Sequence, residues 1–171
     1  MKDVNFVDIT NIWIENAKPG KGNISFSDFV ISFDNNRYDA TNSILNFEVN
    51  EDISCANWFK NNIWGKCTFQ PSIKFPQHIK SADLRIYGKC DLIDGNTIEI
   101  KKVGSVRKDG LTKRIKQANG QSANVLVDVS NHPFNEEIVK ANVKEYFITH
   151  DWIKLIAVVK NNKLLFVWKK K

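Results

Sequence analysis

A turn signal joins two short apolar runs in the stretch Asp91-Leu92-Ile93-Asp94-Gly95-Asn96-Thr97-Ile98-Glu99-Ile100-Lys101. The central Asp-Gly-Asn tripeptide favours a tight reversal of the chain, so this stretch is predicted to form a β-hairpin. Because side chains alternate along a strand, Glu99 and Lys101 share one face of the second strand, and Asp91 stands on the first. The sequence therefore predicts that two carboxylates and one ammonium group converge at this hairpin.

These three groups are suited to the hydrolysis of phosphodiester bonds. Asp91 and Glu99 offer oxygen ligands to a hard divalent cation, Mg²⁺ or Mn²⁺, with the carbonyl of Ile100 as a further ligand and Zn²⁺ as an alternative ion. A bound cation lowers the pKa of a water molecule, and Lys101 would position that water and offset charge on the phosphate. Acid-x-lysine pairs also occur as plain cross-strand charge pairs, and the residues alone leave that alternative open.

Short β-rich runs surround the predicted hairpin and are separated by prolines and glycines. An antiparallel meander needs only tight turns, so neighbouring runs are expected to lie side by side in one sheet. Asp83 begins one of these runs and is a fourth acid near the site. The runs predicted as strands are Cys67–Gln70, Ala82–Tyr87, Cys90–Ile93 and Thr97–Val103.

A helix is predicted upstream of this meander. Asn50 can cap its start, apolar residues recur at helical spacing, and Gly65 ends it. Its first turn holds Glu51 and Asp52. An acid in this position either complements the helix dipole or serves as a remote metal ligand, and both interpretations stand.

A basic helix is predicted directly after the acid-x-lysine pair, within Gly104–Gln121. Apolar residues mark one side of it, and its cations could hold phosphates or simply face solvent. Gln121 ends this segment. The cations are Arg107, Lys108, Lys113, Arg114 and Lys116.

The remaining downstream elements complete a strand, helix, strand order. This order makes the apolar strand Ala123–Val129 parallel to Thr97–Val103. A helix follows that begins at Asn135 or Pro133 and runs to about Phe147. The chain closes with strands at Trp152–Lys160 and Lys163–Trp168, joined as a hairpin at Asn161-Asn162. The chain is therefore predicted to be an α/β protein with a mixed sheet flanked by helices.

Residues 1–50 carry no interpretable motif and are predicted to form a β-rich accessory segment, with a nuclease-like domain at residues 51–171. Their β-branched and aromatic content predicts strands. The expected strands are Val4–Ile14, Ile24–Phe33 and Ile44–Val49.

Composition narrows the partner class. Lys and Arg number 25 against 19 for Asp and Glu, a net charge of +6 that favours an anionic partner such as nucleic acid. No apolar run approaches the ~18 residues needed to span a bilayer, and the N-terminus lacks the apolar core of a secretory signal, so a cytoplasmic protein without a membrane partner is expected. The three cysteines form no C-x-x-C pair, which predicts neither a disulfide set nor a cysteine zinc site.

Two other functions remain open at this stage. A metal-independent ribonuclease would need a histidine as general acid or base, and His132 and His150 flank predicted strands in acceptable positions. A non-catalytic nucleic-acid-binding module would keep the fold and the basic helix. The chain contains no P-loop, G-x-G-x-x-G or G-x-S-x-G motif, which argues against P-loop nucleotide hydrolysis and against a serine hydrolase.

The runs Cys90–Lys101 and Gln121–Ser130 resemble the PD-(D/E)xK nuclease superfamily, and more narrowly the tRNase-like C-terminal domains of contact-dependent inhibition toxins and their phage-associated relatives. The resemblance covers about residues 51–171 and implies a restriction-endonuclease-like core and a cognate immunity protein. It implies magnesium-dependent cleavage of nucleic acid, with RNA and in particular tRNA as the expected substrate and DNA as the alternative. It also implies that a toxin domain would be delivered into the cytoplasm of a target cell.

The resemblance transfers to individual residues only in part. It makes Asp91 the first metal-binding aspartate, although Cys90 stands where the family has proline. Glu99 and Lys101 match the acid-x-lysine pair, Gln121 matches the helix glutamine, and Glu51 or Asp52 matches the helical acid. In a second alignment Asp83 is the first acid and Asp91 the second, which leaves Ile93 where lysine belongs.

Overall fold

The computed structural model describes residues 6–32, 35–39, 44–46, 51–87, 97–104, 107–130, 133 and 135–171. The described chain is a mixed α/β protein, as predicted, with one eight-stranded sheet in the order β1-β12-β11-β10-β9-β8-β6-β2 and two small sheets, β3-β4 and β5-β7. Its helices are α1 (Thr10–Asn16), α2 (Glu51–Asn62), α3 (Lys108–Gln117) and α4 (Glu136–Thr149). Its strands are β1 (Phe6–Asp8), β2 (Ile24–Phe26), β3 (Phe29–Ile31), β4 (Arg37–Asp39), β5 (Ile44–Asn46), β6 (Cys67–Phe69), β7 (Ser72–Phe75), β8 (Leu84–Ile86), β9 (Thr97–Lys102), β10 (Asn124–Asp128), β11 (Leu155–Lys160) and β12 (Lys163–Lys170).

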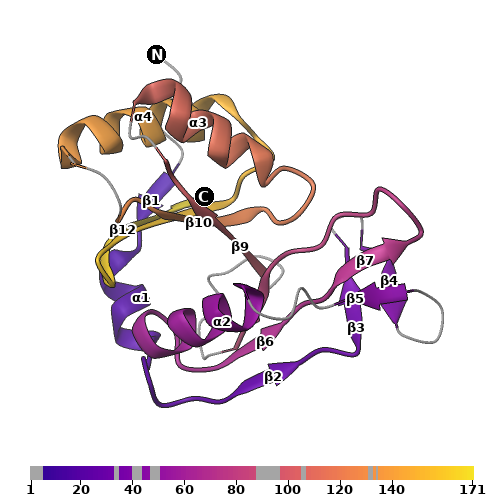
Figure 1. Cartoon of the computed structure of the whole chain (residues 1–171). Helices are drawn as coiled ribbons and strands as arrows, with labels where there is room; N and C mark the ends of the chain where they lie inside the picture. The colour runs from indigo at the N-terminus through magenta and orange to yellow at the C-terminus, as the bar shows by residue number, and fades with distance from the viewer. Residues whose placement is uncertain are drawn as a thin grey trace.

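Helices cover both faces of the large sheet (Figure 1). Helices α3 and α4 pack on one face, where Leu111 and Val143 join a buried cluster with Val125 of β10. Helices α1 and α2 pack on the other, where Trp13 and Phe59 join a second cluster. Residues that alternate along the central strands therefore enter different cores, as expected for a sheet buried on both sides.

The centre of the sheet is parallel. Strand β10 pairs in parallel with both β9 and β11, which confirms the predicted parallel arrangement of the two strands that flank α3. Helices α3 and α4 make the two crossovers and lie on the same face. The carboxyl ends of β9 and β10 consequently meet at one edge, the position where open α/β sheets place their ligands.

The closing hairpin forms as the sequence predicts. Strands β11 and β12 are antiparallel, and Asn161 and Asn162 both have positive φ, 47° and 63°. Asparagine tolerates this left-handed conformation better than most residues, and two such residues in succession suit a tight hairpin turn. The hairpin therefore has a local cause that sequence alone carries.

The predicted strand Val4–Ile14 is wrong over most of its described length. Strand β1 ends at Asp8, whose carboxylate accepts hydrogen bonds from the backbone N–H and the hydroxyl of Thr10, at 2.9 and 2.5 Å. The chain then turns into α1, which buries Trp13 in the same core as Phe59 of α2. The apolar run fits a strand or a short helix, and tertiary packing selects the helix after Asp8.

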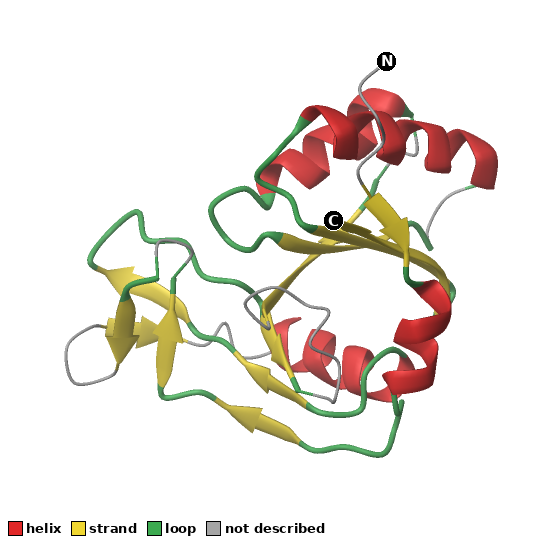
Figure 2. Ribbon diagram, turned by 180° about the vertical axis from the view of Figure 1, so that it is seen from behind, coloured by secondary structure: helices red, strands yellow, loops and turns green. Residues whose placement is uncertain are grey.

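The predicted strand Ile24–Phe33 is divided. Strand β2 pairs in parallel with β6 at one edge of the large sheet, whereas β3 pairs with β4. Strand β5, which covers the start of the expected strand Ile44–Val49, pairs with β7. Figure 2 shows the two small sheets grouped to one side of the large sheet. Within the described ranges, none of the helices has the length and apolar character needed to cross a membrane.

The meander before the candidate site is confirmed for its described strands. Strands β6, β8 and β9 are successive antiparallel neighbours, with Phe69 opposite Leu84 and Leu84 opposite Ile98. Strand β7 was not predicted. The predicted strand Cys90–Ile93 and its turn at residues 94–96 lie outside the described residues.

Candidate active site

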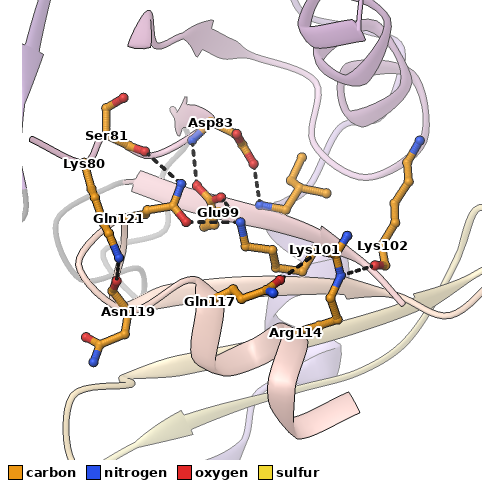
Figure 3. Close-up of polar contacts among 11 residues, drawn as sticks. Lys80, Ser81, Asp83, Glu99, Lys101, Lys102, Arg114, Gln117, Asn119 and Gln121 are labelled. Carbon is orange, nitrogen blue, oxygen red and sulfur yellow. Dashed lines mark hydrogen bonds and ion pairs between the residues drawn. The ribbon is translucent and has the colours of Figure 1, made fainter. Parts of the chain in front are cut away.

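Asp83 and Glu99 meet where β8 diverges from β9. The two strands pair at Leu84 and Ile98. Beyond that pair, the backbone N–H of Asp83 donates to Oε2 of Glu99 at 3.1 Å, and Oδ2 of Asp83 accepts from the backbone N–H of Ile100 at 2.8 Å (Figure 3). Side-chain carboxylates thus take the place of ladder hydrogen bonds, and this exchange brings the two acids together.

Lys101 and Gln121 complete the cluster. The ammonium of Lys101 forms an ion pair with Oε1 of Glu99 and donates to Oε1 of Gln121 at 3.1 Å. The amide nitrogen of Gln121 in turn donates to the carbonyl of Ser81 at 3.4 Å. Four of the residues singled out from the sequence, Asp83, Glu99, Lys101 and Gln121, are therefore connected (Figure 3).

Lys80, which was not predicted as a site residue, connects the segment before Asp83 to the chain that follows α3. The ammonium of Lys80 donates to the carbonyl of Asn119 at 3.1 Å. Gly120, with φ of +85°, then reverses the chain immediately before Gln121. Because a positive φ costs glycine little, this turn is where the chain can change direction and deliver Gln121 to Lys101. A lysine in a polar loop gives no sequence signal for such a role.

Glu99 is the buried member of the cluster, and its burial changes the electrostatics of the site. Glu99 is only 1% exposed. Burial first, and then the neighbouring charge of Asp83, raise the pKa of Glu99 from 4.5 to about 8, against the smaller opposing effect of Lys101. Desolvation disfavours the charged form of a carboxyl, and a nearby like charge adds to this. Burial and the charge of Asp83 therefore favour the protonated form of Glu99 in the metal-free protein, against the ion pair with Lys101.

Gln70 is a second residue that was not predicted. It follows β6, and its backbone N–H donates to the carbonyl of Asp83 at 3.0 Å. Its side chain is 4% exposed, and neither its amide nitrogen nor its amide oxygen has a hydrogen-bond partner among the described residues. Buried amides are normally paired, so the amide of Gln70, unpartnered within the described chain, lowers the stability of this part of the core.

The donors present fit a hard divalent cation better than zinc. Among the described residues, no three His, Cys, Asp or Glu side chains are grouped closely enough to hold a metal by themselves. Asp83 and Glu99 supply two carboxylates, and the carbonyl of Ile100 points to the same side of β9 as its N–H, which contacts Asp83. Oxygen ligands of this kind suit Mg²⁺ or Mn²⁺, whereas Zn²⁺ prefers nitrogen and sulfur.

Some predicted site residues fall outside this description. Asp91 lies outside the described residues, so its part in the site stays a prediction. The acid that the described chain brings to Glu99 is Asp83, because β8 is the neighbour of β9 in the sheet. Glu51 begins α2 and Lys108 begins α3, and the side chains of both are outside the described part of the chain.

The predicted basic face of α3 is divided between two surfaces. Lys113 and Lys116 line a cavity of about 450 Å³ between α3 and α4, together with Glu145 and His150. Arg114 instead reaches the carboxyl end of β9, where its Nε donates to the carbonyl of Lys102 at 2.9 Å. Successive helix residues are turned by about 100°, so cations that are adjacent in sequence face different neighbours. Arg107 is exposed at the start of the helix.

A second cavity, of about 650 Å³, lies beside Asp83 at the carboxyl ends of β9 and β10. Helix α2 borders it on one side and the sheet on the other. We call it the strand-end cavity; its lining residues are Ser54, Cys55, Trp58, Phe69, Asp83, Leu84, Ile100, Lys102, Arg114 and Asp128. Asp83 belongs both to the acid cluster and to the lining of this cavity.

The histidines show no comparable arrangement in the described chain. The Nδ1 atom of His150 contacts the hydroxyl of Thr149 at 2.9 Å and the carbonyl of Tyr146 at 3.0 Å, and its ring stacks on that of Tyr146. His78 adopts a positive φ of 66°, and His132 lies outside the described residues.

Comparisons with protein-family models, with curated proteins and with solved structures find no match to this chain.

Proposed function

We propose that this protein is a metal-dependent nuclease of the PD-(D/E)xK type, with a restriction-endonuclease-like core made of α2, β6, β8, β9, α3 and β10. One observation carries the proposal. Asp83 and the pair Glu99 and Lys101 are connected at a point where two neighbouring strands diverge, and the hydrogen bonds at that point run through their carboxylates. Structural charge pairs on a sheet do not need to interrupt its ladder.

The residues of the cluster have distinct roles in this proposal. Asp83, Glu99 and the carbonyl of Ile100 would hold Mg²⁺ or Mn²⁺, which when bound supplies positive charge and a more acidic water. Lys101 holds the attacking water and stabilises the negative charge that develops on phosphorus. Gln121 fixes the ammonium of Lys101 through its amide oxygen, so the cation stays in place when Glu99 turns toward a metal.

RNA, and tRNA in particular, is the substrate class that we propose, with a toxin-like role and an immunity protein as partner. The resemblance of residues 51–171 to tRNase-like toxin domains is the support for these finer assignments. The net charge of +6 agrees with an anionic substrate. The cluster chemistry itself serves RNA and DNA alike, because water rather than a ribose hydroxyl is the nucleophile.

A cleavage assay on labelled tRNA and on DNA, with Mg²⁺ and with EDTA, tests the proposal. We expect Lys101→Met to lower kcat by about a hundredfold or more, which is typical of removing one transition-state charge partner. Lys154→Met is the matched control, because Lys154 is exposed and precedes β11. Cleavage that persists undiminished in EDTA would contradict metal dependence and point to a histidine mechanism.

A second measurement reads the metal site without relying on activity. We expect Mn²⁺ to raise the melting temperature of the wild-type protein, because a ligand that binds only the native state stabilises it. Asp83→Asn keeps an oxygen that can accept from Ile100 but loses the charge, so the shift should shrink. Tight binding of RNA without any cleavage or metal-induced shift would instead favour a non-catalytic binding module.

A further inference from the structure

We infer that the strand-end cavity binds an unpaired stretch of nucleic acid, with one base stacked on Trp58 and the adjoining phosphates on Lys102 and Arg114. The inference rests on the proposed nuclease function in one respect, which is that the bound nucleic acid leads toward Asp83. It adds a substrate class, single-stranded rather than double-stranded nucleic acid, and a residue that selects it.

Trp58 is placed to act as a stacking platform. Helix α2 turns Ser54, Cys55 and Trp58 toward the cavity at the spacing of one helical face. The indole is half-buried against the core, and its Nε1 donates to Oδ1 of Asn162 at 2.5 Å. Because packing against the core and the bond to Asn162 already hold the indole, it loses little conformational freedom when a base stacks on it. Stacking on an aromatic ring does not depend on the identity of the base.

Two cations lie on the sheet side of the same cavity. Arg114 is fixed there by its bonds to the carbonyl of Lys102 at 2.9 Å and to the side-chain oxygen of Gln117 at 2.7 Å. A guanidinium has five N–H donors, so these two bonds leave others for phosphate oxygens. Lys102 is exposed at the end of β9 and adds a second charge that can follow the backbone.

Two acids, Asp83 and Asp128, also line the cavity and oppose the charge of its two cations. Asp128 is engaged at the end of β10, where Oδ1 accepts from the backbone N–H of Ser130 at 2.9 Å and from its hydroxyl. Asp83 belongs to the proposed metal site, where a divalent ion would offset its charge. The cavity therefore brings an aromatic ring, two cations and Asp83 of the acid cluster to one surface.

The dimensions of the cavity favour an unpaired strand. Its volume of about 650 Å³ lies in the ~300–1,000 Å³ range of pockets for individual small molecules. Helix α2 borders it on one side and the sheet on the other, and a single base is narrower than a duplex, so an unpaired base enters with less obstruction. A paired base would have to be flipped out first, which costs free energy.

Fluorescence anisotropy in EDTA tests this without cleavage, using a short labelled RNA, the DNA of the same sequence, and the duplex of each, with gel analysis to verify that the strands stay intact. We expect the single strands to bind at least tenfold tighter than the duplexes. Trp58→Leu should weaken single-strand binding about tenfold and leave duplex binding unchanged. Trp152→Leu is the control, because Trp152 is also half-buried but packs on the opposite face of the sheet.

Further variants separate stacking from folding. Trp58→Phe keeps an aromatic ring and should retain most of the affinity. Asn162→Ala removes the hydrogen bond that holds the indole and should weaken single-strand binding, though less than Trp58→Leu does. Lys102→Gln should lower the dependence of single-strand affinity on salt by about 0.7 in the log–log slope. These comparisons remain informative even if Trp58→Leu folds poorly.

Equal affinity for single strands and duplexes would overturn the inference. Single-strand binding that Trp58→Leu leaves unchanged would also overturn it, as would a salt slope that Lys102→Gln leaves unaltered. Single-strand binding that depends on Trp58 without any magnesium-dependent cleavage would keep this inference and overturn the nuclease proposal. Magnesium-dependent cleavage of single strands and duplexes at equal rates would keep the nuclease proposal and overturn this inference. Comparing the RNA and DNA strands shows which of them is the tighter ligand.

Discussion

The buried carboxyl of Glu99 makes a specific prediction about how stability depends on pH. Glu99 is buried next to Asp83, and its pKa is raised from 4.5 to about 8. Glu99→Gln is the matching perturbation, because an amide has nearly the shape of a protonated carboxyl and cannot ionise. The wild type and the variant should therefore be most alike when Glu99 is protonated.

The sign follows from comparing proton binding in the two states. Below pH 4.5 the carboxyl is protonated in both the native and the unfolded protein, and its full contribution to stability is present. Between pH 4.5 and about 8 the native protein holds a proton that the unfolded chain has released, so stability falls as pH rises. At about 1.4 kcal/mol for each tenfold change in proton affinity, the loss reaches as much as about 5 kcal/mol.

Urea denaturation of both proteins across this pH range measures the effect. We expect the free energy of unfolding of the wild type, minus that of Glu99→Gln, to decline steadily up to pH 8 and then level off. Glu15→Gln, at an exposed position, should give a flat difference. A difference for Glu99 that is flat, or that increases with pH, would refute the reasoning, because it would mean that Glu99 is ionised in the native protein throughout.

Three other substitutions test the packing around the site and the helices, each by urea denaturation. Gln70→Met should raise the free energy of unfolding by about 1 kcal/mol, because it removes buried amide atoms that have no partner among the described residues; a loss of stability would show that the amide is satisfied. Gly22→Ala should lower the free energy of unfolding by about 3 kcal/mol, because the added Cβ would lie 1.5 Å from the carbonyl oxygen of Gly65. The control is Gly104→Ala, whose Cβ meets nothing within 4 Å and should change the free energy by no more than about 0.5 kcal/mol. Equal effects of the two substitutions would contradict the contact with Gly65. Asn135→Ala should cost about 1 kcal/mol through loss of the N-cap of α4, and an unchanged value would indicate that the cap is replaced by water.

The elements with local causes could be predicted from the sequence. The hairpin at Asn161 and Asn162 depends on two residues that accept positive φ, and α4 begins at an asparagine whose side chain accepts from the N–H groups of Glu137 and Ile138. Each cause lies within a few residues of its effect. The apolar run before Trp13 has no such cause, so its helix depends on packing that the sequence does not state.

The candidate site shows the same division. Glu99 and Lys101 belong to one strand, and their spacing alone places them on one face. The partner acid depends on which strand becomes the neighbour of β9, and that choice is made by the whole sheet. Asp83 was therefore one candidate among several acids. The sequence gives no indication of the roles of Gln70 and Lys80. The buried amide of Gln70, unpartnered among the described residues, and the hydrogen bond from Lys80 to the carbonyl of Asn119 exist only once distant segments of the chain have packed together.

The pairing of β1 with β12 has a mechanical consequence. The two strands are antiparallel, with Phe6 opposite Lys170 and Asp8 opposite Trp168, so residues from the two extremes of the sequence lie at the same end of one ladder. Force applied at residues 6 and 170 would load these hydrogen bonds one after another rather than all together. Hydrogen bonds that break one at a time give way at a lower force than hydrogen bonds that are sheared together along the strands. Force applied at these two residues would therefore detach β1 before it loads the parallel centre of the sheet.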